Sequence, residues 1–313
     1  MHYNSLFINT FQNLNFSVVY QPSCLQQPYN QQCWPIQYPK VAWSNNTIVI
    51  MHCQDFVSTQ NQRCLELVAI EQHFGVWSDR VIVIHWNYNL QSVYTGPLRL
   101  IYFPTHSYEL LINLGNTFSD WSKQLHTPRQ YIWQSLNGLP RPHRRSVVKK
   151  LKQYSMGILS LGTEIPLDNY DYSTYFGCDN ETNWQRLLPV YGNCDVNIVT
   201  ETQYTECPGI ISEKTLMCFL ALQIPIVIGY KGIVDHCRQL GFDMFDDLVD
   251  NSYDQLDNYI RWKQALESNH RLLTNKINRL KLSDRLLANQ QHALNWPSRM
   301  RSNFEQQAVA AMR

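Results

Sequence analysis

The sequence predicts an α/β protein built on parallel sheets, and three observations carry that prediction. Short apolar runs rich in β-branched residues recur along the 313-residue chain. Many are followed by a stretch long enough for a helix, and the runs are continuously apolar rather than alternating. Continuous apolar strands separated by helices are typical of parallel sheets covered on both faces. We therefore expect α/β layering.

Taken in order, the runs fall into two groups. The N-terminal half contains apolar runs at 16–20, 47–51, 81–85 and 98–103. A second group lies near 131–136, 157–161, 196–200 and 224–229. Two sheets therefore fit better than one. From residue 255 onward, apolar residues recur at three- and four-residue spacing, which predicts a helical C-terminal segment.

The two groups predict two domains, with limits at 1–125 and 126–313. The segment 105–130 lies between the groups, and we place the boundary there. No internal repeat or low-complexity tract interrupts either half.

Composition narrows the class of protein. The apolar fraction of 44% supports a core, and only 16% of residues are charged, with a formal net charge of +1. This balance argues against disorder and against a general attraction to nucleic acid or acidic membranes. No apolar run reaches the length of a membrane span, and no signal peptide begins the chain.

The nine cysteines are scattered without a Cys-x-x-Cys pair, which favours free thiols in a reducing cytoplasm. Cys24 and Cys33 are the pair to check first for bridging. We interpret the Asn-x-Ser/Thr triplets at Asn15, Asn45 and Asn180 as chance matches, and we expect a cytoplasmic protein.

Residues that directly follow the strands are the first candidates for function, because ligands bind beyond the carboxyl ends of parallel strands. This criterion selects His52, Asp55, His85, Thr105, His106, Gly162, Thr163, Glu201 and Gly229 to Lys231.

A helix start in the second half suggests an anion site. Ser212 suits an N-cap, and Glu213 and Lys214 would occupy the first turn of the helix. A cation there is unfavourable for the helix dipole unless an anion shares the site. A phosphate at this terminus would explain Lys214, and Glu213 could accept hydrogen bonds from ribose hydroxyls. The alternative is an ordinary capped helix with solvated charges.

A basic cluster lies upstream. Residues 121–160 contain eight Lys or Arg and no Asp or Glu. A solvated helix face explains Lys149, Lys150 and Lys152. The group at 141–145, with Arg141 and Arg144, crowds a predicted strand-to-helix turn, a place suited to anions.

Together the two clusters resemble the α1,3-fucosyltransferase family and related glycosyltransferases of phages and giant viruses. Arg144, Leu151 and Tyr154 keep that family's spacing, with Asn137 before them and Gly162 after. Downstream, the resemblance continues through Glu201, Ser212-Glu213-Lys214 and the run Ile224 to Gly229. The stretch 240–254 is similar to a motif common in the viral relatives. The resemblance covers roughly 130–260.

The resemblance implies a GT-B architecture, in which two Rossmann-like domains face each other across a cleft. The N-terminal domain would bind the acceptor, and the C-terminal domain would bind a GDP- or UDP-linked sugar. Arg144 and Lys214 would contact the diphosphate, and Glu213 the ribose. Glu201 would lie near the donor sugar or its phosphates, as a catalytic residue. Asn137, Arg141, Gly162 and Ser212 complete the expected donor site.

The expected chemistry is glycosyl transfer without a metal or other cofactor. The charge that grows on the leaving diphosphate can be stabilised by preorganised cations. No Asp-x-Asp follows a strand, which removes the usual sign of a divalent metal.

The catalytic base should come from the N-terminal half. The first candidates are Asp55, Glu71 and His85, and His52 and His106 are weaker ones. Asp55 is the leading candidate because it closely follows a strand. The family's base does not align here. Trp77, Trp86 and Tyr88 are aromatic residues that could stack on an acceptor or belong to a core.

Three kinds of acceptor fit the sequence: a glycan, a protein and a modified DNA base. The basic segment 141–152 mildly favours DNA. A protein that keeps the fold and binds without turnover, such as a virion-associated protein, is the other hypothesis.

Overall fold

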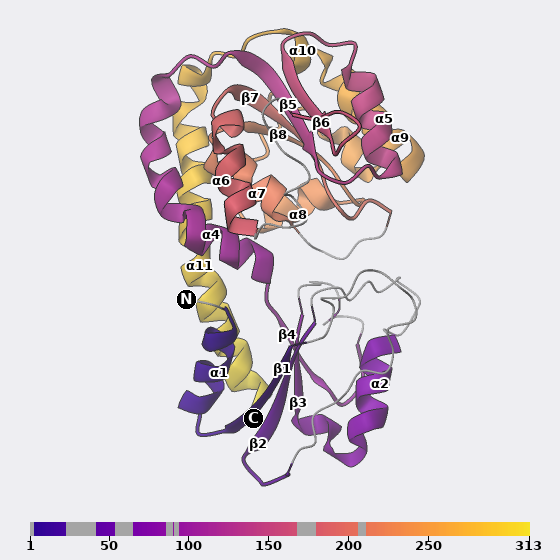
Figure 1. Cartoon of the computed structure of the whole chain (residues 1–313), viewed down its shortest axis with the longest axis vertical. Coiled ribbons are helices and arrows are strands. Elements are labelled where there is room, and N and C mark those ends of the chain that lie inside the picture. The colour runs from indigo at the N-terminus through magenta and orange to yellow at the C-terminus, as the bar shows by residue number, and fades with distance from the viewer. Residues whose placement is uncertain are drawn as a thin grey trace. The chain divides into compact units, whose positions relative to one another are not determined.

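The computed structural model describes residues 3–22, 42–53, 65–85, 90, 94–167, 180–205 and 211–313. The chain divides into two compact units (Figure 1). Unit 1 holds the described residues up to Glu109 together with Pro297–Arg313, and unit 2 holds those from Leu110 to Trp296. Each unit contains its own sheet.

Unit 1 is built on a four-stranded sheet of β1 (Ser17–Pro22), β2 (Thr47–Cys53), β3 (Val81–His85) and β4 (Arg99–Tyr102). The strands lie in sequence order, and every neighbouring pair is parallel. The sheet therefore runs in one direction, with no reversal of strand order.

Helices cover this sheet with apolar side chains. In unit 1 they include α1 (Tyr3–Asn13), α2 (Leu65–Phe74) and the 3-10 helix η1 (Gly75–Arg80). One core cluster contains Val49, Leu67, Ile70, Phe74, Val81, Val83, Leu90 and Leu98. A second contact group joins the rings of Phe7, Phe11, Phe103 and Phe304.

Unit 2 contains the other four-stranded sheet, with β5 (Tyr131–Asn137), β6 (Gly157–Leu161), β7 (Cys194–Thr200) and β8 (Ile224–Ile228). Its spatial order is β6-β5-β7-β8, and all three pairs are parallel. The chain leaves β5 on one side to form β6, then crosses back past β5 to form β7. The order of the strands therefore reverses at β5.

Helices lie on both faces of the second sheet. The connections are α5 (Pro142–Leu151), α6 (Asn180–Tyr191) and α7 (Glu213–Leu220), followed by α8 (Ile233–Gln239). The reversal at β5 places α5 with α9 on one side of the sheet and α6 with α7 on the other (Figure 1). The remaining elements are α4 (Thr105–Ser119), η2 (Asp120–His126), η4 (Ser252–Gln255), α9 (Asn258–Ser268), α10 (His270–Thr274), η5 (Arg279–Leu282) and α11 (Ser283–Ala311).

Helix α11 contributes to both units. In unit 2, the Gln290 side-chain amide donates to the carbonyls of Phe118 (3.0 Å) and Leu220 (2.8 Å). In unit 1, the Gln307 side chain accepts from the Tyr102 amide at 3.1 Å and donates to its carbonyl at 3.3 Å. The expected limits at 1–125 and 126–313 differ from this division, because they assign residues 110–125 to the first domain and all of α11 to the second.

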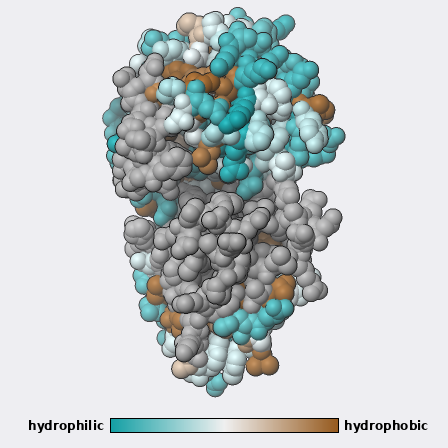
Figure 2. Space-filling model, turned by 45° about the vertical axis from the view of Figure 1, so that its right-hand side comes forward, coloured by the Kyte–Doolittle hydropathy of each residue, from teal (hydrophilic) through white to brown (hydrophobic). Residues whose placement is uncertain are grey.

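The eight predicted strands are present, and the two parallel sheets confirm the α/β class. Each unit is compatible with a Rossmann-like fold, whereas the GT-B arrangement stays a prediction. Among the described residues, no helix is long and apolar enough to cross a membrane. The exposed apolar side chains on the face drawn in Figure 2 are scattered among hydrophilic ones.

Candidate functional site

The strand reversal at β5 gives the second sheet a switch point. Strand β5 pairs with β6 on one side and with β7 on the other. In open parallel sheets, ligands bind at the carboxyl ends of the two strands where the order reverses. Here those ends carry Asn137 on β5 and Thr200 and Glu201 at and after the end of β7.

Asn137 ties the ends of three strands together. It is almost completely buried, and its carboxamide nitrogen donates to the Ser160 carbonyl of β6 at 3.2 Å. Its carboxamide oxygen accepts a hydrogen bond from the Thr200 hydroxyl of β7. These contacts are internal to the protein, so Asn137 shapes the floor of the site.

Gly162 fits where only glycine can lie. Its φ is +51°, in the left-handed region, and its amide donates to the Asn137 carbonyl at 2.7 Å. A Cβ atom at this position would lie 2.7 Å from the Gly138 carbonyl oxygen. Both the backbone conformation and the close approach therefore require glycine.

The predicted start of α7 is confirmed. Ser212 is the N-cap, with extended backbone angles, and its hydroxyl accepts a hydrogen bond from the Lys214 amide at 3.2 Å. Glu213 and Lys214 occupy the first turn, as the sequence predicts.

The Glu201 carboxylate is buried and fully engaged within the protein. One oxygen accepts from the Ser212 amide at 3.2 Å and from the Thr215 hydroxyl at 2.6 Å. The other accepts from the Thr202 amide at 3.3 Å. These contacts join the end of β7 to the start of α7, which makes Glu201 a positioning residue here rather than a group presented to a ligand.

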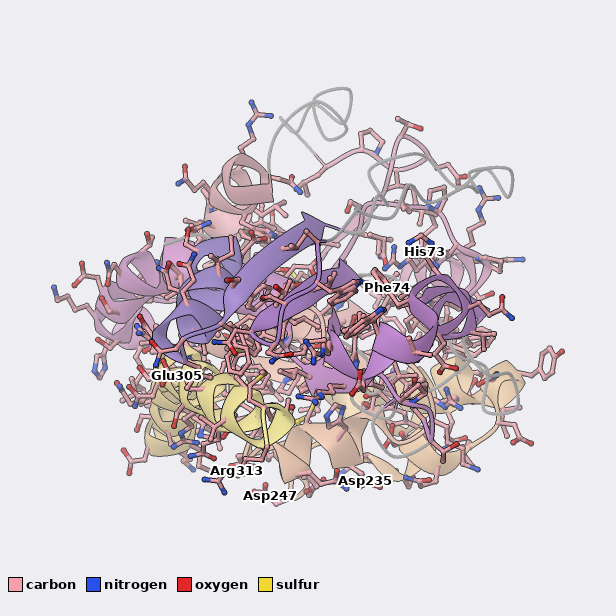
Figure 3. The ribbon with its side chains drawn as sticks, turned by 90° about the horizontal axis from the view of Figure 1, so that it is seen from below. His73, Phe74, Asp235, Asp247, Glu305 and Arg313 are labelled. Carbon is pink, nitrogen blue, oxygen red and sulfur yellow. The ribbon has the colours of Figure 1, made fainter. Side chains whose placement is uncertain are left out.

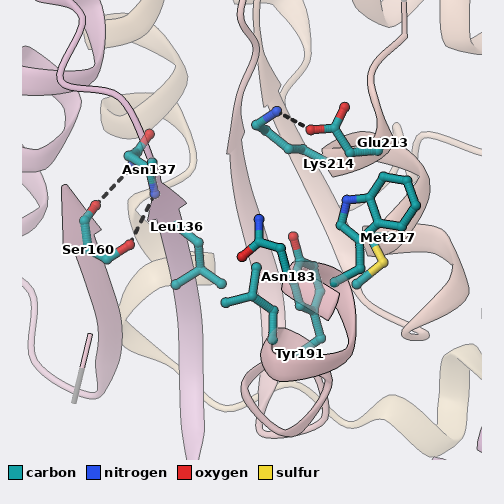
Figure 4. Close-up of a pocket in the computed structure, with 11 residues that line it drawn as sticks. Leu136, Asn137, Ser160, Asn183, Tyr191, Glu213, Lys214 and Met217 are labelled. Atoms are coloured by element: carbon teal, nitrogen blue, oxygen red, sulfur yellow. Dashed lines mark hydrogen bonds and ion pairs between the residues drawn. The ribbon is translucent and has the colours of Figure 1, made fainter. Parts of the chain in front are cut away.

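Lys214 and Glu213 form an ion pair beside the switch point (Figure 4). About a fifth of each side chain is exposed, at 22% and 24%. Burial by itself would lower the pKa of the Lys214 ammonium, but Glu213 and Glu201 outweigh that effect, and its pKa lies above the ordinary value. Lys214 is therefore a cation at neutral pH.

These two residues line a small cavity at the carboxyl edge of the sheet. Its other walls come from β5, β6, α6 and α7, through Leu136, Asn137, Gly138, Ser160, Asn183, Trp184, Leu187, Tyr191 and Met217 (Figure 4). The cavity volume is about 60 Å³. Ligand sites for whole nucleotide-sized molecules are several times larger. The cavity therefore matches one chemical group of a ligand.

Arg141 and Arg144 direct their guanidinium groups to the backbone. Arg144 is almost completely buried and donates to the carbonyls of Leu139 (3.2 Å) and Thr200 (3.1 Å). Arg141 donates to the Thr202 carbonyl at 3.2 Å. The two arginines hold the loops after β5 and β7 together. Their expected contact with a diphosphate stays a prediction.

A stacked ring pair that was not predicted from the sequence lies beside these loops. The His143 and Tyr204 rings are parallel, with centroids 4.5 Å apart, and the Arg261 guanidinium lies 5.5 Å from the Tyr204 centroid. His143 Nε2 is 3.0 Å from the Glu201 carbonyl, so that nitrogen carries the proton. Burial, with Arg144 and Arg141 adding to it, lowers the pKa of His143 to about 4, although the Glu201 carbonyl acts in the opposite direction.

Some residues that line the cavity were not predicted from the sequence, although their spacing carries a signal. Trp184, Leu187 and Tyr191 have the three- and four-residue spacing of one helix face, which identifies α6 as amphipathic. Arg261 has no such signal, because two of its acceptors, the carbonyls of Tyr204 and Gly229, come from distant segments of the chain.

Among the base candidates in unit 1, Asp55 lies outside the described residues, as do the side chains of His52 and His106. His85 is fully buried at the end of β3. The Glu71 carboxylate accepts a hydrogen bond from the Tyr94 hydroxyl at 2.5 Å. Trp77 stacks on Trp43 with 5.3 Å between ring centroids. The burial of His85 and the contacts of Glu71 and Trp77 fit structural roles for all three.

The exposed basic face predicted for α5 is present in part. Lys149 and Lys152 are exposed, whereas Lys150 pairs with Glu267 at 3.3 Å and Arg145 pairs with Glu164. In the part of the chain that the structure describes, no group of three His, Cys, Asp or Glu is arranged to hold a metal ion.

No protein-family model, no curated protein and no solved structure matches the chain.

Proposed function

We propose that the protein is a glycosyltransferase whose nucleotide diphosphate-sugar donor binds at the carboxyl edge of the second sheet. The observation that carries the proposal is the position of Lys214. This cation lies in the first turn of a helix, partly buried, and lines a cavity at the switch point of a parallel sheet. The motif spacing around Arg144 and Lys214 supplies the reaction class.

Lys214 would bind the donor diphosphate mainly through its charge. The amides of Ser212 and Lys214 are already bonded to Glu201 and to the Ser212 hydroxyl, so two donors of the helix start are used internally. The ammonium group has three donors, and the Glu213 carboxylate takes one of them. Charge on a partly desolvated ammonium is the remaining source of anion affinity.

Glu213 would accept from the ribose hydroxyls with its other oxygen, and the cavity beside it would enclose one group of the donor. The rest of the donor would extend along the carboxyl edge. Asn137, Gly162, Glu201, Ser212, Arg141 and Arg144 would then act by fixing the loops that carry Lys214 and Glu213.

In the transfer step, an acceptor hydroxyl attacks the anomeric carbon while the bond to the diphosphate breaks. Lys214 would stabilise the charge that builds up on the departing diphosphate. A base in the N-terminal half would take the proton of the acceptor, with Asp55 as the candidate from sequence.

Binding without turnover is the second hypothesis, and it would use the same donor site. No contact in the described structure favours a DNA acceptor, because Arg141, Arg144 and Arg145 already engage partners within the chain. That acceptor therefore rests on the sequence pattern alone.

Calorimetric titration with GDP, UDP and CDP tests the donor site. We expect one nucleotide to bind, and Lys214→Ala to weaken it at least tenfold, about 1.4 kcal/mol. Lys149→Ala is the matched control, since it removes an exposed lysine of the same unit. Binding that is unchanged in Lys214→Ala, or no binding of any nucleotide, would refute the site.

Incubation of the matching nucleotide-sugars with candidate acceptors separates transfer from binding. We expect release of the nucleoside diphosphate to continue in excess EDTA, because Lys214 takes the place of a metal. Binding without release under all conditions would leave the non-catalytic hypothesis, and loss of activity restored by magnesium or manganese would contradict the mechanism.

A further inference from the structure

Unit 2 contains a second and larger pocket away from Lys214. It is an open hollow of about 590 Å³ between α8 and the segment 246–255. Its lining comprises Asp235, Arg238, Asp246, Asp247, Leu248, Val249, Asp250, Asn251, Ser252, Asp254 and Gln255. The volume falls within the usual range for small-molecule sites.

The lining carries a strong excess of negative charge. Five aspartates face one cation, Arg238, whose guanidinium is already bonded to Asp235 and Asp246. Hydrogen bonds from Arg238 and Ser252 keep the pKa values of Asp246 and Asp250 below their ordinary range. Asp235 and Asp247 reach the same edge of the ribbon in Figure 3. Burial raises the pKa of Asp254, but the other four aspartates still outnumber the single arginine, so the pocket attracts cations at neutral pH.

Two buried oxygens in this lining accept no hydrogen bond from the described residues. Asp254 is 2% exposed; its Oδ2 accepts from the amides of Val234 (3.1 Å) and Asp235 (3.3 Å), but its Oδ1 has no donor. The side-chain oxygen of Asn251, a residue that is 9% exposed, also has no hydrogen-bond donor. A buried acceptor without a donor costs about 1–3 kcal/mol. Both oxygens would gain from a ligand that donates hydrogen bonds.

The arrangement favours an organic cation over a metal ion. The described aspartates do not form a cluster that could coordinate one ion. They are spread around a hollow far larger than an ion and its ligands. Several separated carboxylates and two unsatisfied acceptors suit a molecule with more than one protonated amine, since each ammonium brings both charge and three donors.

We propose that this pocket binds a small polyamine, with one ammonium group directed to Asp254 and Asn251 and another to the exposed aspartates at the rim. The site is distinct from that of the donor and does not depend on the proposed transferase function.

Titration of the full-length protein with spermidine, followed by calorimetry at low and at moderate salt, tests the proposal. The key variant is Asp254→Asn. The oxygen of the introduced asparagine can still accept hydrogen bonds from the Val234 and Asp235 amides. Its NH₂ group, however, places a donor at the pocket where an ammonium group of the ligand needs an acceptor. Asp120→Asn is the control, since it removes one negative charge from an exposed site of the same unit.

We expect Asp254→Asn to weaken spermidine binding at least tenfold and Asp120→Asn to change it less than twofold. If Asp254→Asn fails to fold, Asp250→Asn replaces it, with a threefold or larger loss expected. Equal binding in pocket and control variants would mean general charge attraction and would overturn the proposal. So would the absence of binding at millimolar spermidine, or tighter binding of Mg²⁺ to the same residues.

Discussion

At the scale of single residues, the Glu201 carboxylate shows how the site is held in place. Both of its oxygens accept hydrogen bonds from groups on the β7–α7 connection and on α7 itself. Its backbone amide also donates to the Ile228 carbonyl of β8 at 2.9 Å. One acidic residue therefore fixes the helix start that presents Glu213 and Lys214.

Glu201→Gln should destabilise the protein. A carboxamide has one acceptor oxygen where the carboxylate has two, so the Thr202 amide or the pair formed by the Ser212 amide and the Thr215 hydroxyl would face an NH₂ group. We expect a loss of about 1–3 kcal/mol in the free energy of unfolding, measured with urea. Glu164→Gln, which alters an exposed ion pair with Arg145, should cost less than about 1 kcal/mol. Equal stability of Glu201→Gln and the parent would contradict this role.

At the scale of elements, Arg261 connects α9 to the ends of two strands. Its guanidinium donates to the carbonyls of Gly229 (2.6 Å), Tyr204 (3.2 Å) and Leu256 (2.8 Å). Burial lowers the pKa of this arginine, and the carbonyls compensate for its lost hydration. The loops after β7 and β8 are thus fixed by a side chain from a helix outside the predicted motifs.

Arg261→Met keeps much of the apolar volume but leaves several buried carbonyls without donors. We expect the free energy of unfolding to fall by about 3 kcal/mol or more. Hydrogen exchange should increase at residues 202–205 and 229–232, where the anchored loops lie. Arg271→Met, at an exposed position of α10, is the control and should stay within about 0.5 kcal/mol of the parent. Exchange that increases uniformly across the unit would argue against a local anchoring role.

At the scale of the whole molecule, two buried histidines make stability depend on pH. Burial lowers the pKa of both His143 and His236 to about 4. An unfolded histidine has a pKa near 6.5, so between about pH 6.5 and 4 the unfolded chain binds more protons than the folded one. These two residues therefore make the protein less stable as pH falls through that window, and they have no such effect above it.

The comparison of unfolding at pH 7 and pH 5 isolates this effect. His143→Gln, which can keep a donor for the Glu201 carbonyl, should lose less stability on acidification than the parent protein. His126→Gln, at an exposed position of η2, should behave as the parent does. If His143→Gln and the parent have the same pH dependence, folding does not change the pKa of His143, which would contradict this role.

The sequence by itself determined the strands and their class. Residues 81–84 and Ile224–Ile228 are continuously apolar, and only a sheet covered on both faces can bury every residue of such a run. It also determined the start of α7, because a serine before Glu-Lys and an apolar helix is a local signal that depends on neighbouring residues alone. The sequence also identified Gly162 as a candidate, because this residue directly follows a predicted strand.

Only the tertiary structure decided how the predicted site residues are used. The reversal of strand order at β5 depends on which strands pair, and no local pattern encodes that choice. Arg144 was expected at a ligand from the family resemblance, and Glu201 also from its place after a strand. In the folded chain, backbone carbonyls, amides and hydroxyls lie within reach of them. Long-range packing decides whether a charge meets solvent, a ligand or the protein itself, and that cannot be read from sequence spacing.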